Sequence, residues 1–314
     1  MQVFFPSRRS GGARNETAFR GGAVDVRHRR RVVIGAGLAG LAAAQQLQAA
    51  GLKPIVFDKA DTVGAVWRRH YDRLHLHTPR SLSALPGLAM PASYGRYPSR
   101  AQFVEYLESY AAAFGLEPAF NTAVRAVRRA GQGWRVEAGA DPVDSPIVVV
   151  ATGWADFRHS PSWPGMQTFG GRILHSSVYR NATPFSGQRA LVVGFGNSGA
   201  EIALDLCESG AAATLAVRSP VRVLPRDWLG LPIVGFSIVQ RSLPARIADA
   251  INAPFRRRDR FADRPAPSDR HRRGARRQRG SATAARKTRL SRHSAEVVRA
   301  NACSSPPMRP LSAA

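Results

Sequence analysis

The sequence contains little cysteine, little acidic charge and no long uninterrupted hydrophobic run. Its 314 residues include two cysteines, Cys207 and Cys303, which exclude a disulfide-rich scaffold, a four-cysteine zinc site and a Cys-x-x-Cys redox pair. The eight histidines are scattered without the spacing of metal ligands, so we expect no metal site. With 44% hydrophobic residues the chain is not disordered as a whole, and its length allows two domains.

Acidic side chains are most strongly outnumbered at the two ends of the chain. The 46 Lys and Arg against 21 Asp and Glu give a formal net charge of +25. Residues 1–31 hold 8 basic and 2 acidic side chains and residues 255–314 hold 17 and 4, whereas the 223 residues between them hold 21 and 15. The centre is therefore an ordinary, mildly basic globular sequence, and the excess charge belongs to the ends.

The apolar run that follows Arg29-Arg30-Arg31 is too short to span a membrane. It begins at Val32 and is interrupted by three glycines and then by three glutamines. A basic stretch followed by an apolar one resembles a signal peptide, but the polar interruptions favour a cytoplasmic protein without a cleaved signal or a transmembrane segment.

The first strand–helix–strand unit covers residues 32–58. Residues 32–34 are typical of a buried parallel strand, residues 38–50 have helical spacing, and residues 54–57 predict a second strand. The turn between the first strand and the helix reads Gly35, Ala36, Gly37, Leu38, Ala39, Gly40. In such a turn the first glycine permits a tight bend, the second lets a pyrophosphate approach and the third lets helix and strand pack. Asp58, about twenty residues on, would bind ribose hydroxyls, so the unit predicts a dinucleotide site.

A second unit of the same design begins at residue 190. A strand at 190–193 precedes a helix that ends near residue 209 and a strand at 214–217. Its turn reads Gly194, Phe195, Gly196, Asn197, Ser198, Gly199. The second strand ends in Arg218-Ser219, where an NAD site has an acid; since arginine suits a 2′-phosphate, NADPH is the preferred cofactor. The alternative is a surface arginine on a structural loop.

Two dinucleotide sites indicate two cofactors. The economical interpretation is FAD at the first and NADPH at the second, with hydride passing between them. A disulfide reductase would share both sites but needs the redox cysteine pair that this chain lacks. The fold class is therefore predicted to be α/β with two Rossmann-like dinucleotide-binding units.

Other elements are also readable between the two units. Ser99 can cap a helix from Arg100 to about Phe114, residues 122–138 alternate as in a hairpin, and residues 147–150 predict another buried strand. The core face of the helix would hold Phe103, Leu107, Tyr110 and Phe114.

Several ordered segments resemble those of flavin-containing monooxygenases. The stretch from residue 169 to 179 resembles the family signature FxGxxxHxxxY, and residues 64–67 and 151–153 resemble its Gly-x-x-Trp and Ala-Thr-Gly segments. Residues 71–79 and 96–99 are similar to the plant YUCCA-type and bacterial branch. The resemblance covers about two-thirds of the chain. The signature residues are Phe169, Gly171, His175 and Tyr179.

The resemblance implies that NADPH reduces FAD, that oxygen adds to the reduced flavin, and that the resulting C4a-hydroperoxide oxygenates a small organic substrate. It also implies that Asp58, Val66 and Trp67 contact FAD. The partners would be a small molecule and molecular oxygen, with no specific nucleic acid and a possible homodimer. N- or S-oxygenation, Baeyer–Villiger insertion and decarboxylative oxygenation of indole-pyruvate all fit.

The sequence predicts different roles for His77 and His175. Residues 77–80 align where many family members place an asparagine beside the flavin, so His77 is the candidate catalytic residue and Thr78 a cofactor contact. The alternative is that His77 merely packs or bonds a backbone carbonyl. His175 is expected to fix the linker rather than to act as a general base.

No strand, helix or glycine motif is readable after about residue 254. The family's FAD domain is discontinuous and is completed by returning chain, so here it is expected to be incomplete at the C-terminus. The Arg-rich tail is interpreted as disordered; it would bind nucleic acid or an anionic membrane, be a solvated extension, or arise from a frameshift, which we favour. The predicted domains are 1–29 disordered, 30–155 FAD-binding, 156–254 NADPH-binding with a linker at 156–187, and 255–314 disordered.

The sequence therefore predicts an FAD- and NADPH-dependent monooxygenase. Residues 1–29 are interpreted as an over-long start. The competing hypotheses are an inactive truncated or frameshifted fragment and an uncoupled NADPH oxidase that releases peroxide.

Overall fold

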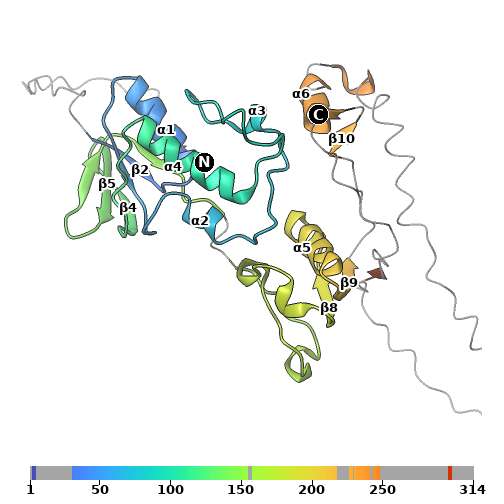
Figure 1. The fold of residues 1–314 in the computed structure, drawn as a ribbon. Coiled ribbons are helices and arrows are strands. Elements are labelled where there is room, and N and C mark those ends of the chain that lie inside the picture. The colour runs from blue at the N-terminus through green and yellow to red at the C-terminus, as the bar shows by residue number, and fades with distance from the viewer. Residues whose placement is uncertain are drawn as a thin grey trace, which may run out of the picture. The chain divides into compact units, whose positions relative to one another are not determined.

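Figure 1 draws the structure of the protein, a computed structural model. The chain divides into two units, Met1–Arg180 and Asn181–Ala314. The division falls inside the linker that was predicted at residues 156–187. The described residues are 2–4, 30–154, 158–217, 226–228, 230–240, 243–247 and 296–298.

The first unit is built on a four-stranded sheet of order β1-β7-β2-β3. Strand β2 (Arg31–Ile34) pairs in parallel with β3 (Pro54–Phe57) on one side and with β7 (Val148–Val150) on the other. Strand β1 (Gln2–Phe4) pairs with β7 in the antiparallel direction. The three parallel strands confirm the strands predicted at these positions.

Different layers cover the two faces of this sheet. Val33 belongs to a buried cluster that includes residues of α1 (Leu38–Ala49) and α4 (Arg100–Ala113). Val32 and Ile34 point the other way, into a second cluster with an antiparallel sheet. That sheet consists of β4 (Val124–Ala130), β5 (Gly133–Ala138) and β6 (Val143–Ser145). The alternation along β2 therefore produces three layers, with both parallel-sheet faces buried.

Helix α4 begins as its sequence predicts. The Ser99 side chain accepts a hydrogen bond from the Gln102 amide while the Gln102 side chain accepts one from the Ser99 amide, which is a capping box. Phe103, Leu107 and Tyr110 are buried on its core face, and Phe114 is half-buried at its end. The predicted helix and its core face are confirmed.

Two buried tyrosines of α4 hold the loop at residues 85–88. The Tyr106 hydroxyl accepts from the Leu85 amide and donates to the Leu88 carbonyl, both at 2.7 Å. The Tyr110 hydroxyl donates to the Pro86 carbonyl at 2.7 Å, and burial raises the pKa of Tyr110 to about 12. The loop therefore takes its position from polar contacts inside the apolar core.

Tyr106→Phe should lower the free energy of unfolding by about 1–3 kcal/mol, because it leaves a backbone donor and a backbone acceptor without partners. Tyr110→Phe removes a single bond to an exposed proline, so its cost should be smaller, about 1 kcal/mol. Urea unfolding followed by circular dichroism measures both variants. Equal losses of unfolding free energy in the two variants would contradict the larger cost expected for Tyr106→Phe.

The second unit has a parallel pair of strands covered by one helix. Strand β8 (Arg189–Val193) pairs with β9 (Ala212–Val217), and α5 (Asn197–Glu208) contacts both. This confirms the second strand–helix–strand unit. The short 3₁₀ helix η4 (Thr183–Phe185) precedes β8, and a small hairpin of β10 (Asp227–Trp228) and β11 (Leu231–Pro232) precedes α6 (Ile233–Gln240).

Three elements differ from the sequence predictions. Strand β12 (Glu296–Val298) pairs antiparallel with β9, so the prediction of no readable strand after residue 254 is wrong at these three residues. Strand β1 lies within the segment 1–29, which was predicted without structure. Helix α3 (Arg80–Ser83) is a single helical turn at residues where the sequence pattern predicts no element. Both strands depend on pairing with distant residues, which a local pattern does not reveal. The remaining residues of the two ends lie outside the described residues.

Candidate functional site

The first glycine turn is closely packed at two of its three glycines. Gly35 has φ of 106°, and a Cβ there would lie 2.5 Å from the Ala151 carbonyl oxygen. A Cβ on Gly40 would lie 1.7 Å from the Gly35 carbonyl oxygen. The turn therefore lies against the backbone of Ala151, the residue that follows β7.

The middle glycine of this turn faces open space. A Cβ on Gly37 would meet no atom within 4 Å, so packing within the chain does not require glycine at this position. Gly37 is the N-cap of α1, which has no side-chain cap and no acidic residue in its first turn. Its first amide groups are thus suited to an anionic ligand that needs close approach to the backbone.

Asp58 lies at the end of β3 and is bonded to the turn. Its Oδ2 accepts from the Ala36 amide at 2.5 Å and its Oδ1 accepts from the Ala60 amide at 2.8 Å. The carboxylate therefore fixes the turn to the adjacent strand, and each oxygen retains a lone pair that a ribose hydroxyl could use. The predicted ribose contact is compatible with this geometry.

The second glycine turn repeats the geometry of the first. Gly194 has φ of 101°, and a Cβ on Gly199 would lie 2.2 Å from the Gly194 carbonyl oxygen. A Cβ on Gly196 would again meet nothing within 4 Å, and α5 begins there without a side-chain cap. Phe195 and Ser198 are half-buried, whereas Asn197 is exposed. The predicted 2′-phosphate residues, Arg218 and Ser219, lie outside the described residues.

The residues predicted beside the flavin lie on two segments of the first unit. Val66 and Trp67 are half-buried in α2 (Ala65–Arg68), and the Trp67 ring meets Phe103 edge-on with centroids 4.5 Å apart. His77 is exposed, and the Oγ1 of the half-buried Thr78 lies 2.5 Å from the Ser83 Oγ. Trp67 is therefore held by the core, while His77 is accessible to a ligand.

The signature residues have different environments. Phe169 is exposed, and a Cβ on Gly171 would lie 2.5 Å from the Phe169 ring. His175 precedes the 3₁₀ helix η3 (Ser176–Val178) and caps it, because its Nδ1 accepts from the Ser177 amide at 3.2 Å. Tyr179 is buried and packs edge-on against Tyr71. The contact of His175 gives it a structural task in the linker.

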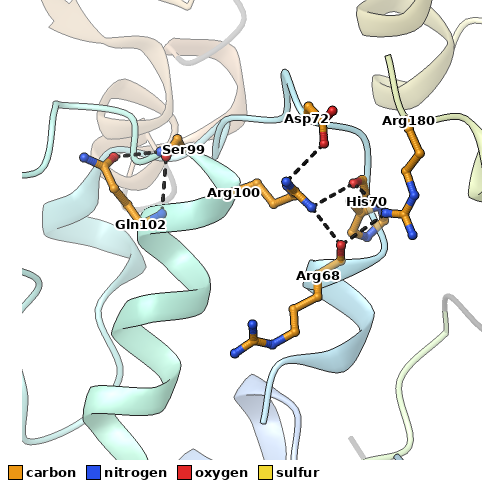
Figure 2. Close-up of polar contacts among 7 residues, drawn as sticks. All are labelled: Arg68, His70, Asp72, Ser99, Arg100, Gln102 and Arg180. Carbon is orange, nitrogen blue, oxygen red and sulfur yellow. Dashed lines mark hydrogen bonds and ion pairs between the residues drawn. The ribbon is translucent and has the colours of Figure 1, made fainter. Parts of the chain in front are cut away.

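Sequence reasoning missed a cluster of charged residues after α2 (Figure 2). Arg100 and Arg180 both donate from Nη1 to the carbonyl oxygens of Arg68 and His70. Arg100 also forms an ion pair with Asp72 at 3.1 Å. Asp72 lies within residues 71–79 and Arg100 directly follows residues 96–99, but their separation of 28 residues gave no sign of the contact.

The imidazole of His70 lies within this cluster. Burial lowers the pKa of His70, and the positive charges of Arg100, Arg180 and Arg69 lower it further. The folded protein therefore disfavours a charged His70.

Acidification should weaken the fold through His70. Well above pH 6.5, His70 is neutral in both the folded and the unfolded chain. As the pH falls through 6.5, the unfolded chain takes up a proton at His70 before the folded chain does, because the pKa is lower in the folded chain. Stability is therefore lost from pH 6.5 down to the lowered pKa. In urea unfolding at pH 7.5 and pH 5.5, His70→Gln should show a smaller difference between the two conditions than the wild type. The exposed His159→Gln is the matched control, and an unchanged difference in His70→Gln would contradict the assignment.

The described part of the chain contains neither a metal-binding cluster nor a membrane-spanning helix. No three His, Cys, Asp or Glu side chains gather there as a metal centre would require. None of the helices described is both long and apolar enough to cross a bilayer.

The two turns define the class of protein. Each unit has a strand, a glycine turn with one open position and a helix with an uncapped N-terminus, in the order of a Rossmann-type nucleotide-binding unit. The chain is thus an α/β protein with two units of the dinucleotide-binding kind.

Comparison with known proteins gives the family. The family model described as pyridine nucleotide-disulphide oxidoreductase matches residues 32–227. An indole-3-pyruvate monooxygenase, YUCCA1 of Oryza sativa subsp. japonica, is 44% identical over 223 residues, which cover 69% of this chain and 55% of the relative. The chain therefore spans about half the length of the curated relatives that it matches.

Solved structures agree with this result. A flavin-containing monooxygenase from Stenotrophomonas maltophilia has a TM-score of 0.58 and 31% identity, covering 69% of each chain. A complex of OTEMO with FAD and NADP has a TM-score of 0.53 and 26% identity, covering 62% of this chain and 40% of that one. The chain belongs to the pyridine nucleotide-disulphide oxidoreductase family and, within it, to the flavin-containing monooxygenases. This confirms the resemblance seen in the sequence.

Proposed function

We propose that the protein is an NADPH-dependent flavoprotein monooxygenase that oxygenates a small organic substrate with molecular oxygen. The observation that carries this proposal is the repetition of one geometry, an open middle glycine before an uncapped helix, in a chain of this family. Two such sites suit two nucleotide cofactors, and the sequence lacks the Cys-x-x-Cys pair that disulfide reduction would use.

FAD would bind in the first domain, assigned to residues 30–155. The open face at Gly37 and the first amides of α1 suit its pyrophosphate, and Asp58 suits its ribose. Trp67 would contact the flavin from α2 together with Val66, and Thr78 from the segment before α3. His77 would hydrogen-bond near the reactive edge of the ring, where a neutral imidazole can donate one bond.

NADPH would bind in the second domain, assigned to residues 156–254 with a linker at 156–187. The open face at Gly196 suits its pyrophosphate. Arg218 and Ser219 would contact the 2′-phosphate and so select NADPH over NADH. When both cofactors are bound, they supply hydride transfer and oxygen activation, while the protein orients them and excludes water.

Indole-3-pyruvate is the proposed first substrate, because the relatives at 36–44% identity are named for it. Decarboxylative oxygenation would convert this 2-oxo acid, oxygen, NADPH and a proton into indole-3-acetate, carbon dioxide, water and NADP⁺.

The predicted cytoplasmic location and homodimer stay predictions, and the homodimer can be tested by size-exclusion chromatography with light scattering.

The test is the stoichiometry of the FAD-reconstituted chain in air. NADPH oxidation, indole-3-acetate and hydrogen peroxide are measured with and without indole-3-pyruvate, and NADH replaces NADPH as the control. One indole-3-acetate per NADPH supports the proposal. Peroxide without product would favour the uncoupled oxidase, and absence of NADPH oxidation by the flavin-loaded chain would contradict the proposal.

A further inference from the structure

The cluster shown in Figure 2 joins three segments that are distant in sequence. They are the turn that follows α2, the start of α4 and the last residue of the first unit, Arg180. The Arg100 Nη1 lies 2.7 Å from the Arg68 oxygen and 3.2 Å from the His70 oxygen. The Arg180 Nη1 lies 3.1 and 3.2 Å from the same two oxygens.

The backbone of Arg180 is held as well as its side chain. The Asp72 amide donates to the Arg180 carbonyl oxygen at 2.8 Å, and the Asp72 carboxylate pairs with Arg100. Both the backbone carbonyl and the guanidinium group of Arg180 are therefore bonded to the turn after α2. Two guanidinium groups share two carbonyl oxygens beside one carboxylate, and these acceptors offset the repulsion between the two like charges.

A row of aromatic contacts runs from α2 to the linker. Trp67 meets His70 with ring centroids 5.6 Å apart, His70 meets Tyr71 at 6.3 Å, and Tyr71 meets Tyr179 at 6.5 Å, all edge-on. Tyr179 is buried at the end of this row. The signature tyrosine is thus packed against the same turn that the arginines bind.

We propose that Arg180 and Arg100 form a clamp that positions the linker on the turn after α2, so that the chain leaves the first unit at a fixed point beside the predicted flavin contacts. We call Arg180, Arg100 and the carbonyls of Arg68 and His70 the exit clamp. It acts through Trp67 and Tyr179, and neither arginine is placed in contact with a cofactor. The role in hydride transfer rests on the proposed function, whereas the anchoring of the linker does not.

The exit clamp is expected to act on the position of the linker rather than on the stability of the fold. Exposed arginine pairs generally contribute little to stability, and Arg180 is exposed. Loss of its bonds should therefore leave folding and the FAD turn nearly unchanged. Freedom of the linker would instead vary the placement of the second unit, which begins at Asn181, and a misplacement of about 1 Å can slow a reaction by roughly 100-fold.

The variant that breaks the clamp is Arg180→Met, with Arg180→Lys as the conservative replacement that keeps a charged donor. The matched control is Arg158→Met, which removes an exposed arginine from the same linker. The first measurement needs no cofactor: the rate at which trypsin cuts after the exposed Arg172 in the folded full-length chain. Arg180→Met should be cut about tenfold faster or more, because local release of the segment lets the backbone around Arg172 unfold into the protease. Arg158→Met should match the wild type, and Arg180→Lys should lie between.

The second measurement is anaerobic stopped-flow reduction of the FAD-loaded chain. Arg180→Met should slow reduction by NADPH about 10- to 100-fold while leaving the FAD dissociation constant and the reduction by dithionite unchanged. Unchanged cleavage would overturn the clamp, and faster cleavage with unchanged NADPH reduction would overturn its positioning role. If the wild type binds FAD but is not reduced by NADPH, the proposed function fails, and the cleavage rates still decide whether Arg180 anchors the linker.

Discussion

Gly40→Ala should lower the free energy of unfolding by more than about 3 kcal/mol and prevent FAD binding. The added Cβ would stand 1.7 Å from the Gly35 carbonyl oxygen, which is backbone and has no rotamer to escape into. Overpacking a core usually costs about 1–3 kcal/mol, and a clash of this depth with backbone lies above that range. Gly35 itself lies against the Ala151 carbonyl, which limits how far the turn can shift away from the added methyl group.

The variant is measured by thermal and urea unfolding and by FAD titration. Gly95→Ala is the matched control, because a Cβ there meets nothing within 4 Å and the residue lies outside both turns. A Gly40→Ala protein with wild-type stability would show that helix α1 can move away from β2. That result would contradict the close packing of the turn.

Gly37→Ala should have the opposite profile, with unchanged stability and much weaker FAD binding. Its φ of −76° suits alanine, and the Cβ would enter space that contains no protein atom. A methyl group there would push a pyrophosphate away from the helix amides. Hydrogen bonds to a charged group contribute about 1.5–3 kcal/mol each, so affinity should fall on the order of 10- to 100-fold or more.

Isothermal titration with FAD and urea unfolding separate the two effects. Gly196→Ala serves as the control, because it makes the same change in the second turn, where FAD is not expected to bind. Unchanged FAD affinity in Gly37→Ala would mean that the pyrophosphate does not approach this face. The first turn would then be a packing device rather than a binding site.

The two turns could be predicted from sequence because their requirements are local. A strand, three spaced glycines and a helix occur within a few residues, and the glycine at the third position is required by the carbonyl of the first. The Ser99 cap and the core face of α4 are equally local, since Ser99 and Gln102 lie one turn apart.

Other features depend on contacts that no local pattern encodes. The exit clamp brings together residues 68–72, 100 and 180, and each arginine considered alone is one of many in a basic chain. Strands β1 and β12 exist through pairing with β7 and β9, so their short sequences carry little signal by themselves. Ala151 belongs to the Ala-Thr-Gly segment, but its contact with Gly35 forms only when the sheet is assembled.

The environment of a residue could also not be inferred from its identity alone. His77 and His175 both lie in segments that resemble the family, yet His77 is exposed and His175 caps a 3₁₀ helix through Nδ1. His70 attracted no prediction, although it lies among three arginines that lower its pKa. These differences arise from packing around each ring rather than from spacing in the chain.

The most direct test of two working nucleotide sites is the visible absorption spectrum of the full-length chain, reconstituted with FAD and recorded before and after NADPH in air. We expect a protein-bound flavin band that bleaches on addition of NADPH and returns as oxygen is consumed. A chain that retains no FAD after reconstitution and gel filtration, or a bound flavin that NADPH does not bleach, would contradict the account.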